Sequence, residues 1–227
     1  MPKPPANATR FKRLLLRWFR ACGRDLPWRL TRDPYRVLVS EFMLQQTQVP
    51  RVRDFYQRFL ARFPSLTVLA DARPSAVREA WEGLGYYRRA ANLHALARTV
   101  VSDHGGCIPD DPTALERLPG VGRYTAGAVA SFAYERRVPA VDTNAARVLR
   151  RAFKPRLPSG ARGQRALQGL ATRILPSKAR TVWEFNQALM DLGSLHCTAK
   201  RPNCPACPVN AACRTGRASK EHGARDA

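Results

Sequence analysis

The chain has 227 residues, of which 39 are Lys or Arg and 17 are Asp or Glu, so its formal net charge at pH 7 is +22. In a chain that is 44% hydrophobic, this charge indicates a folded protein that binds a polyanion, because neutralising phosphates releases counterions. No apolar run reaches the roughly 18 residues of a membrane span, and residues 1–5 lack the apolar core of a signal peptide. We therefore expect a cytoplasmic protein and no membrane partner.

Helical patterns follow one another along the chain, whereas the alternation typical of strands is scarce. We expect a first helix over residues 10–22, where apolar residues recur at helical spacing, and a second near 37–48. Prolines then punctuate several short helices. A further helix should follow Asp142 as far as about residue 152, and 161–195 should form two more. The sequence thus predicts an all-α protein.

The order of these helices predicts two helical lobes, one of them built from both ends of the chain. We expect a disordered N-terminus (1–9), a lobe formed by 10–49 with 133–196, a central lobe (50–132), a cysteine loop (197–213) and a flexible tail (214–227). A cleft between the lobes would be the natural place for a ligand.

Four cysteines are set as C-x6-C-x2-C-x5-C near the end of the folded region: Cys197, Cys204, Cys207 and Cys213. Thiolates at such spacing hold zinc or an iron–sulfur cluster. The unequal gaps depart from the paired C-x2-C layout of a zinc ribbon and favour one loop wrapped around a [4Fe-4S] cluster. On spacing alone, zinc and unligated thiols remain the alternatives.

The segment Leu118–Gly122 lies between two predicted helices. Its proline and two glycines, Gly120 and Gly122, permit a tight turn, after which the N–H groups of the next helix point outward and can bind a phosphate. Asp142 follows about twenty residues later and precedes an arginine-rich helix, so we expect it to be an N-cap. Taken alone, the Pro-Gly segment is better explained as a plain turn, and Asp142 is equally well explained as a plain cap.

Together, Leu118–Gly122, Asp142 and the four cysteines resemble the helix-hairpin-helix, Gly/Pro-rich, Asp-containing (HhH-GPD) superfamily of DNA glycosylases over about residues 10–214. Four more segments resemble its branch of MutY adenine-DNA glycosylases: LPWR at 26–29, SEFMLQQTQV at 40–49, GLGYY at 83–87 and FNQALMDLG at 185–193. The resemblance implies a [4Fe-4S] cluster on the cysteines and a DNA-binding cleft between the lobes. It also implies a monomeric, nucleoid-associated enzyme acting on double-stranded DNA with a mismatched or damaged base pair.

The resemblance assigns catalytic roles to four residues. Glu41 matches the general acid that protonates the extruded base, which a carboxylic acid can do near neutral pH only if burial raises its pKa. Asp142 matches the carboxylate that stabilises the oxocarbenium-like sugar, and Asn144 matches a residue that orients this chemistry. Tyr124 stands where the bifunctional endonuclease III enzymes have the Lys that forms a Schiff base. Because a phenol cannot form one, we expect little AP-lyase activity.

The resemblance also implies DNA contacts. Gln46 matches the residue that fills the hole left by the flipped base, and Tyr86 or Tyr87 matches the wedge near the opposite base. The other pocket and intercalation residues that it implies are Trp28, Arg29, Leu44, Gln45, Thr47 and Gln187. The DNA-backbone contacts are expected from Gly120, Gly122, Arg123 and Arg147. Trp28 and Leu44 are equally well explained as core residues.

Three functions remain open. The resemblance favours monofunctional excision of adenine opposite G or 8-oxoguanine. Short glycosylases that remove thymine or uracil from T·G and U·G pairs share a Tyr at Tyr124 and a Glu at Glu41. A non-catalytic iron–sulfur DNA-binding module is more remote, since it should lack Glu41 or Asp142.

The chain departs from the MutY pattern in one respect. Full-length MutY enzymes carry a further C-terminal domain that helps recognise 8-oxoguanine, whereas this sequence stops at Ala227, soon after the cysteines. We therefore expect a short form without that domain, and the preference for 8-oxoguanine stays open.

Overall fold

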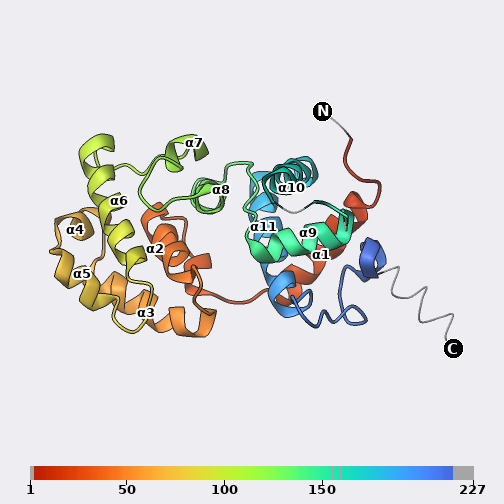
Figure 1. The fold of residues 1–227 in the computed structure, drawn as a ribbon, viewed down its shortest axis with the longest axis horizontal. Coiled ribbons are helices and arrows are strands. Elements are labelled where there is room, and N and C mark those ends of the chain that lie inside the picture. The colour runs from red at the N-terminus through yellow and green to blue at the C-terminus, as the bar shows by residue number, and fades with distance from the viewer. Residues whose placement is uncertain (1–2, 155, 159, 217–227) are drawn as a thin grey trace. The chain divides into compact units, whose positions relative to one another are not determined.

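The computed structural model describes residues 3–154, 156–158 and 160–216, and within them the secondary structure is helical, with no strand (Figure 1). The all-α prediction is confirmed. The chain divides into two compact units: unit 1 is Met1–Arg24 with Arg137–Ala227, and unit 2 is Asp25–Arg136. In the described part of the chain, no helix is both long and apolar enough to cross a membrane.

Unit 2 contains eight helical segments among the described residues. In chain order they are η1 (Pro27–Arg29), α2 (Pro34–Leu44), α3 (Val49–Arg62), α4 (Leu66–Asp71), α5 (Pro74–Ala80), α6 (Arg88–His104), α7 (Pro112–Leu115) and α8 (Arg123–Phe132). Helix α2 contacts α3, α6 and α8, and eight of its eleven residues are buried. A helix that is enclosed on most sides forms the core of its unit.

The two ends of α2 differ from the predicted 37–48. The helix begins at Pro34 because the Asp33 side chain accepts hydrogen bonds from two backbone N–H groups of the first turn, and Pro suits the first helical position. It ends at Leu44 because Gln46 has a φ of 59°, which a right-handed helix cannot accommodate.

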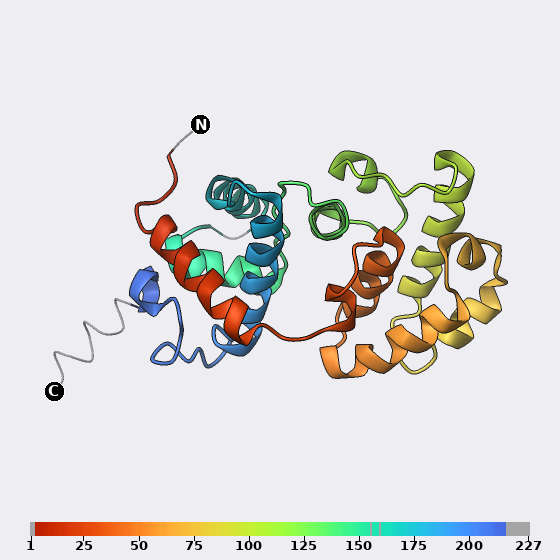
Figure 2. The ribbon, with the colours of Figure 1, turned by 180° about the vertical axis from the view of Figure 1, so that it is seen from behind.

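Unit 1 contains α1 (Ala8–Cys22), α9 (Thr143–Phe153), α10 (Gly160–Ile174), α11 (Ala179–Leu195) and η2 (Asn210–Ala212), coloured red and green to blue in Figure 2. Helix α11 contacts both α1 and α9. The core between them includes residues that are fully buried, among them Phe11, Leu15, Leu149, Phe185 and Leu192. At Gly193 an added Cβ would lie 2.6 Å from Cβ of Asn144, so a glycine is required where α11 passes the start of α9.

The division of the chain differs from the predicted lobes. Residues 25–49 lie in unit 2, because α2 packs against the central helices rather than against the C-terminal ones. Part of the segment expected to be disordered is ordered, since Asn7 Nδ2 donates to the carbonyl of Ala212 at 2.7 Å and α1 begins at Ala8. Of the expected flexible tail, residues 217–227 lie outside the described residues.

Candidate functional site

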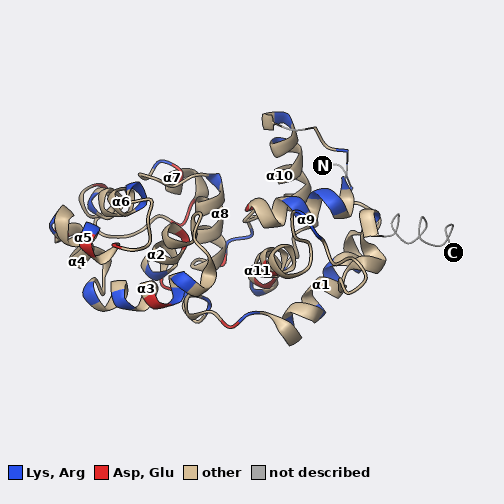
Figure 3. Ribbon diagram, turned by 60° about the horizontal axis from the view of Figure 1, so that its bottom comes forward, with Lys and Arg blue, Asp and Glu red and all other residues tan. Residues whose placement is uncertain are grey.

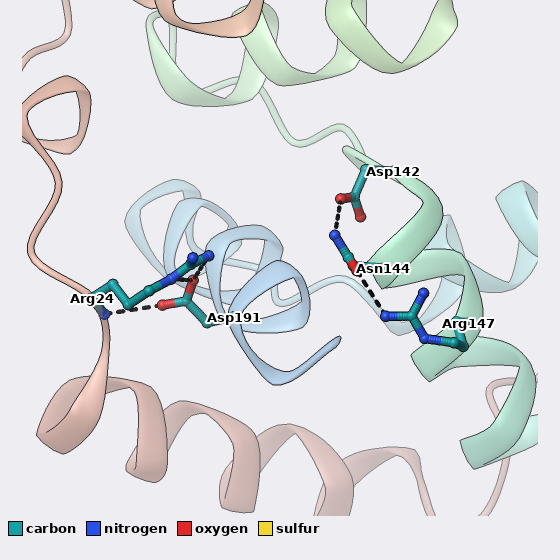
Figure 4. Close-up of polar contacts among 5 residues, drawn as sticks. All are labelled: Arg24, Asp142, Asn144, Arg147 and Asp191. Carbon is teal, nitrogen blue, oxygen red and sulfur yellow. Dashed lines mark hydrogen bonds and ion pairs between the residues drawn. The ribbon is translucent and has the colours of Figure 1, made fainter. Parts of the chain in front are cut away.

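In unit 1, Asp142 is the N-cap of α9, as the sequence predicted. One carboxylate oxygen accepts a hydrogen bond from the backbone N–H of Ala145 at 2.6 Å, and the other accepts one from Nδ2 of Asn144 at 2.9 Å. Oδ1 of Asn144 in turn accepts from Arg147 at 2.7 Å (Figure 4). The carboxylate is therefore held in one orientation at the positive end of a helix dipole.

Burial raises the pKa of Asp142 above its usual value. The hydrogen bonds from Ala145 and Asn144, together with the charge of Arg147, oppose this rise and favour the anion. A carboxylate that has lost part of its hydration interacts more strongly with a nearby cation than a fully solvated one does. The arrangement suits the stabilisation of positive charge.

Arg147 connects this carboxylate to the cysteine loop. Its Nε donates to the carbonyl of Cys197 at 2.6 Å, and its Nη2 donates to the carbonyl of Gly193 at 2.7 Å as well as to Asn144. These bonds engage the guanidinium within unit 1. Its predicted contact with the DNA backbone stays a prediction.

All four cysteines line one cavity of about 30 Å³ in unit 1. Its wall also includes apolar residues of α1, α9 and α11: Phe11, Val148, Ala152 and Leu192. Among the described residues, no three Cys, His, Asp or Glu side chains are placed to hold a single metal ion. Cysteines around one cavity could each ligate one iron of a [4Fe-4S] cluster.

Several N–H groups contact the cysteine sulfurs. Arg151 donates to Sγ of Cys197 at 3.4 Å, and the backbone N–H of Gly216 donates to Sγ of Cys213 at 3.5 Å. Burial raises the pKa of the Cys207 thiol to about 11, so that its thiolate form requires a metal partner at neutral pH. The residues present therefore fit a cluster held by four thiolates.

A second feature of unit 1 is the ion pair between Arg24 and Asp191 (Figure 4). The guanidinium lies 2.6 Å from a carboxylate whose side chain is fully buried, and the backbone N–H of Arg24 donates to the same carboxylate at 3.0 Å. Arg24 is the last residue of the first segment of unit 1, and the ion pair attaches it to Asp191 on α11. The ion pair could not be predicted from the sequence, because no local pattern links two residues so far apart.

In unit 2, Glu41 lies on α2 with only 5% of its surface exposed. Val39, Phe42 and Met43 beside it are fully buried, which agrees with the apolar surroundings expected from the sequence. Its role as an acid remains a prediction. Leu44, the last residue of the same helix, is partly buried.

The Leu118–Gly122 turn joins α7 to α8, as predicted. Gly120 has a φ of 74°, and a Cβ there would lie 2.7 Å from Cβ of Asn92, so a glycine is required. Gly122 caps α8 without a side chain, and space around it is open. The side chain of Arg123 is 62% exposed at the same helix end, and the half-buried Tyr124 follows it.

The remaining predicted residues fall into buried and exposed groups. Trp28 and Arg29 of η1 are buried, and the Trp28 ring meets Tyr56 edge to face at 5.5 Å. Gln187 is buried on α11 in unit 1. The exposed or partly exposed group consists of Gln45, Gln46, Thr47, Tyr86 and Tyr87. The structure brings this group onto two loops of unit 2, which flank α2 and α6.

Comparison with known proteins identifies the protein family to which the chain belongs. Residues 39–170 match the family model of HhH-GPD superfamily base excision DNA repair proteins. The chain belongs to this superfamily.

Two curated relatives are named adenine DNA glycosylase. The protein of Mycobacterium tuberculosis H37Rv is 45% identical over 86% of this chain, and the human protein is 44% identical over 92% of it. The chain spans 64% of the mycobacterial relative and 40% of the human one.

Solved structures agree with the fold. A thermostable thymine-DNA glycosylase is similar with a TM-score of 0.86 and 30% identity, covering 93% of this chain and 97% of that one. A non-covalent endonuclease III–DNA complex is similar with a TM-score of 0.77 over 94% of this chain and 98% of that one, at 22% identity.

Proposed function

We propose that this chain is a monofunctional DNA glycosylase of base excision repair, which hydrolyses the N-glycosidic bond of an adenine mispaired with G or 8-oxoguanine. The observation that carries the proposal is Asp142, a partly dehydrated carboxylate fixed by Ala145 and Asn144. The 45% identity to an adenine DNA glycosylase supports adenine as the base. The partner is double-stranded DNA, bound by a monomer in the nucleoid.

Glu41 supplies the proton in this mechanism. Burial disfavours the charged form of a carboxylic acid, so an enclosed Glu can carry a proton to a ring nitrogen of the flipped base. The base then leaves with the electron pair of the glycosidic bond. Gln46, with Tyr86 or Tyr87, fills the space that the base vacates in the stack.

Asp142 stabilises the sugar cation that departure of the base creates. Its charge is supported by fixed hydrogen bonds rather than by mobile water, so little reorganisation is needed as the cation forms. Water adds to C1′ and releases a proton, which leaves the free base and an abasic site. Asn144 keeps the carboxylate oriented through this sequence.

Tyr124 is the reason to expect no strand cutting. A lyase needs an amine that attacks C1′ and forms a Schiff base, and a phenol has no nitrogen with which to do so. The abasic product is therefore released with its strand intact.

The four cysteines would hold a [4Fe-4S] cluster. Their placement around one cavity, together with a spacing that departs from the zinc-ribbon layout, supports the cluster. When bound, the cluster would supply four metal–sulfur bonds that hold the 197–213 loop together.

A second candidate is excision of thymine or uracil opposite G, which the similarity to a thermostable thymine-DNA glycosylase supports. Single-turnover assays on duplexes with one A·8-oxoG, A·G, T·G or U·G pair, each with and without alkali, separate the two. We expect adenine release, with strand cuts only after alkali. Release of thymine or uracil alone would overturn the choice of base, and cuts without alkali would overturn the argument from Tyr124.

A further inference from the structure

Two loops of unit 2 hold the side chains proposed to enter the DNA stack. One follows α2 and contains Gln46, whose φ is 59°; the other precedes α6 and contains Tyr86, whose φ is 49°. A positive φ is uncommon for residues other than glycine and is retained only where the surroundings enforce it. Gly83 and Gly85 of the second loop also have positive φ, of 92° and 74°. Gly adopts a positive φ readily, so Gln46 and Tyr86 are the residues whose backbone conformation the surroundings must enforce.

The guanidinium of Arg89, in the first turn of α6, joins these loops. Only 7% of Arg89 is exposed. Its hydrogen-bond acceptors around α2 and the first loop are the carbonyls of Phe42, Met43 and Gln45 and the hydroxyl of Thr47. Its acceptors in the second loop are the carbonyls of Leu84 and Gly85, at 3.3 and 3.1 Å. One buried side chain therefore bonds to the backbone of both loops.

The same group lies over two aromatic rings. Its central carbon is 5.3 Å from the ring centroid of Tyr86 and 5.6 Å from that of Trp81. Tyr86 is 61% exposed, so its ring is held against the guanidinium on one side and accessible on the other. Arg89 thereby orients the exposed ring as well as the backbone that carries it.

The geometry demands arginine. The carbonyls at the end of α2 carry the negative end of its dipole, which a buried cation satisfies. A guanidinium offers five donors in a planar fork, whereas the ammonium of Lys offers three from one point and cannot reach both loops together.

We propose that Arg89 is a positioning residue, which presets the Gln46 and Tyr86 loops for entry into the DNA stack. If the loops are ordered before binding, none of the binding free energy is spent on ordering them. Because they enter only a DNA stack that has a gap, the saving strengthens binding to gapped DNA and not to fully stacked DNA. This inference rests on the proposed function and adds to it a residue that touches neither the base nor the sugar.

Arg89→Lys tests the inference, with Arg88→Lys at the exposed neighbouring position as its matched control. The readouts are Tm and the affinities for two duplexes, one with a tetrahydrofuran abasic analogue opposite 8-oxoguanine and one fully paired. We expect Arg89→Lys to weaken binding to the abasic duplex by about tenfold. Binding to the paired duplex, and both affinities of Arg88→Lys, should change by less than about twofold.

Repeating Arg89→Lys in a Gln46→Ala/Tyr86→Ala background distinguishes a purely structural role of Arg89 from the positioning of Gln46 and Tyr86. If Arg89 acts through these side chains, it should lose its effect on abasic-duplex binding there, leaving less than about a twofold change. A full effect in that background, or equal weakening on both duplexes, would overturn the inference. If wild type releases adenine and Arg89→Lys binds like Arg88→Lys, only this inference fails; if wild type releases no adenine, the proposed function fails.

Should Arg89→Lys not fold, two variants at glycine positions, Gly85→Ala and Gly105→Ala, provide the test instead. Gly85 and Gly105 both have positive φ with nothing within 4 Å of a built Cβ, so alanine strains each backbone without a clash. Gly85→Ala should weaken binding to the abasic duplex, whereas Gly105→Ala, at the far end of α6, should not. Equal binding by the two variants would overturn the claim that a preset second loop matters.

Discussion

The two units of the molecule differ sharply in charge. Unit 1 carries 24 Lys and Arg against 5 Asp and Glu, a net +19, whereas unit 2 carries 15 against 12, a net +3. Among the described residues, most of the acidic positions lie on unit 2 (Figure 3). Unit 1 therefore holds almost all of the charge that attracts a polyanion, together with Asp142 and the cysteines. Unit 2 holds the loops proposed to sense a gap in the stack. Under the proposed function, long-range attraction would fall to unit 1 and local discrimination to unit 2.

Asp142 is distinctive among the acidic residues described in unit 1. Glu184 lies 2.7 Å from Arg20 and Asp191 lies 2.6 Å from Arg24, so each is directly neutralised by an arginine. Asp142 is held instead by a backbone N–H and by the amide of Asn144. This strongly basic unit thus contains one oriented carboxylate, which the proposed mechanism uses to stabilise a transient cation.

The largest effect is expected from Asp142→Asn, which removes this anion but keeps a good N-cap. Single-turnover release of adenine should fall by at least about 100-fold, because the sugar cation loses its counter-charge. DNA binding should persist, since the basic surface is unchanged. Excision at the wild-type rate would show that the charge of Asp142 is dispensable.

The same variant should be more stable than wild type at neutral pH. Burial raises the pKa of Asp142 in the folded protein, so the folded state holds this proton more tightly than the unfolded state does. Ionisation of Asp142 therefore lowers the free energy of unfolding. This loss develops as the pH rises from 3.8, the ordinary pKa, through the raised pKa of the folded protein. Melting curves should show a higher Tm for Asp142→Asn at pH 7 and equal values below pH 3.8. A lower Tm at pH 7 would contradict the raised pKa.

Cys204→Ser should affect unit 1 and leave unit 2 unchanged. We expect loss of iron, a lower Tm and faster hydrogen exchange in 197–213 and the adjoining α9, with unit 2 unchanged. Cys107→Ser, at an exposed thiol in unit 2, is the control and should behave as wild type. Full iron content and unchanged exchange in Cys204→Ser would remove the cysteine loop as a metal site.

Arg20 of α1 and Arg24 just after it give a matched test of how much two ion pairs contribute to the stability of unit 1. Arg24→Met removes the cation beside a fully buried carboxylate, and we expect a loss of about 2 kcal/mol, below the usual cost because the Arg24 side chain is 26% exposed. Arg20→Met breaks an exposed pair and should cost less than about 1 kcal/mol. Denaturant unfolding measures both, and equal losses would contradict the ranking.

The smallest effect concerns the salt dependence of DNA binding. Arg123→Ala, at the exposed start of α8, should lower the slope of log Kd against log salt by about 0.9, the value for one phosphate contact. Arg98→Ala, an exposed arginine on α6, should leave the slope unchanged. An unchanged slope in Arg123→Ala would remove that phosphate contact.

Local sequence signals predicted the fold class and several elements well. Helical spacing located α1, α9, α10 and α11, and the Asp142 cap was recognisable because capping depends on neighbouring residues. The end of α2 was missed, because no turn residue marks the positive φ of Gln46. The boundary between the units was missed too, since the side on which α2 packs depends on contacts with distant helices.

The parts of the site that sequence could not supply are contacts over long separations. Arg89 lies in an Arg-Arg pair that resembles any solvated helix start, yet it bonds to carbonyls more than forty residues away. Arg147 and Arg151 resemble a basic helix face, yet their guanidiniums bond to the cysteine loop. Only the folded chain shows which arginines are structural.

The most direct test of the proposed mechanism is single-turnover excision by Glu41→Gln on a duplex with one A·8-oxoG pair. Glu79→Gln, at an exposed acid of α5, makes the same chemical change away from α2 and serves as the control. Glu41→Gln should bind the duplex as wild type does, yet release adenine at least about 100-fold more slowly, while Glu79→Gln matches wild type in both. Release at the wild-type rate by Glu41→Gln would contradict the assignment of the acid to unit 2.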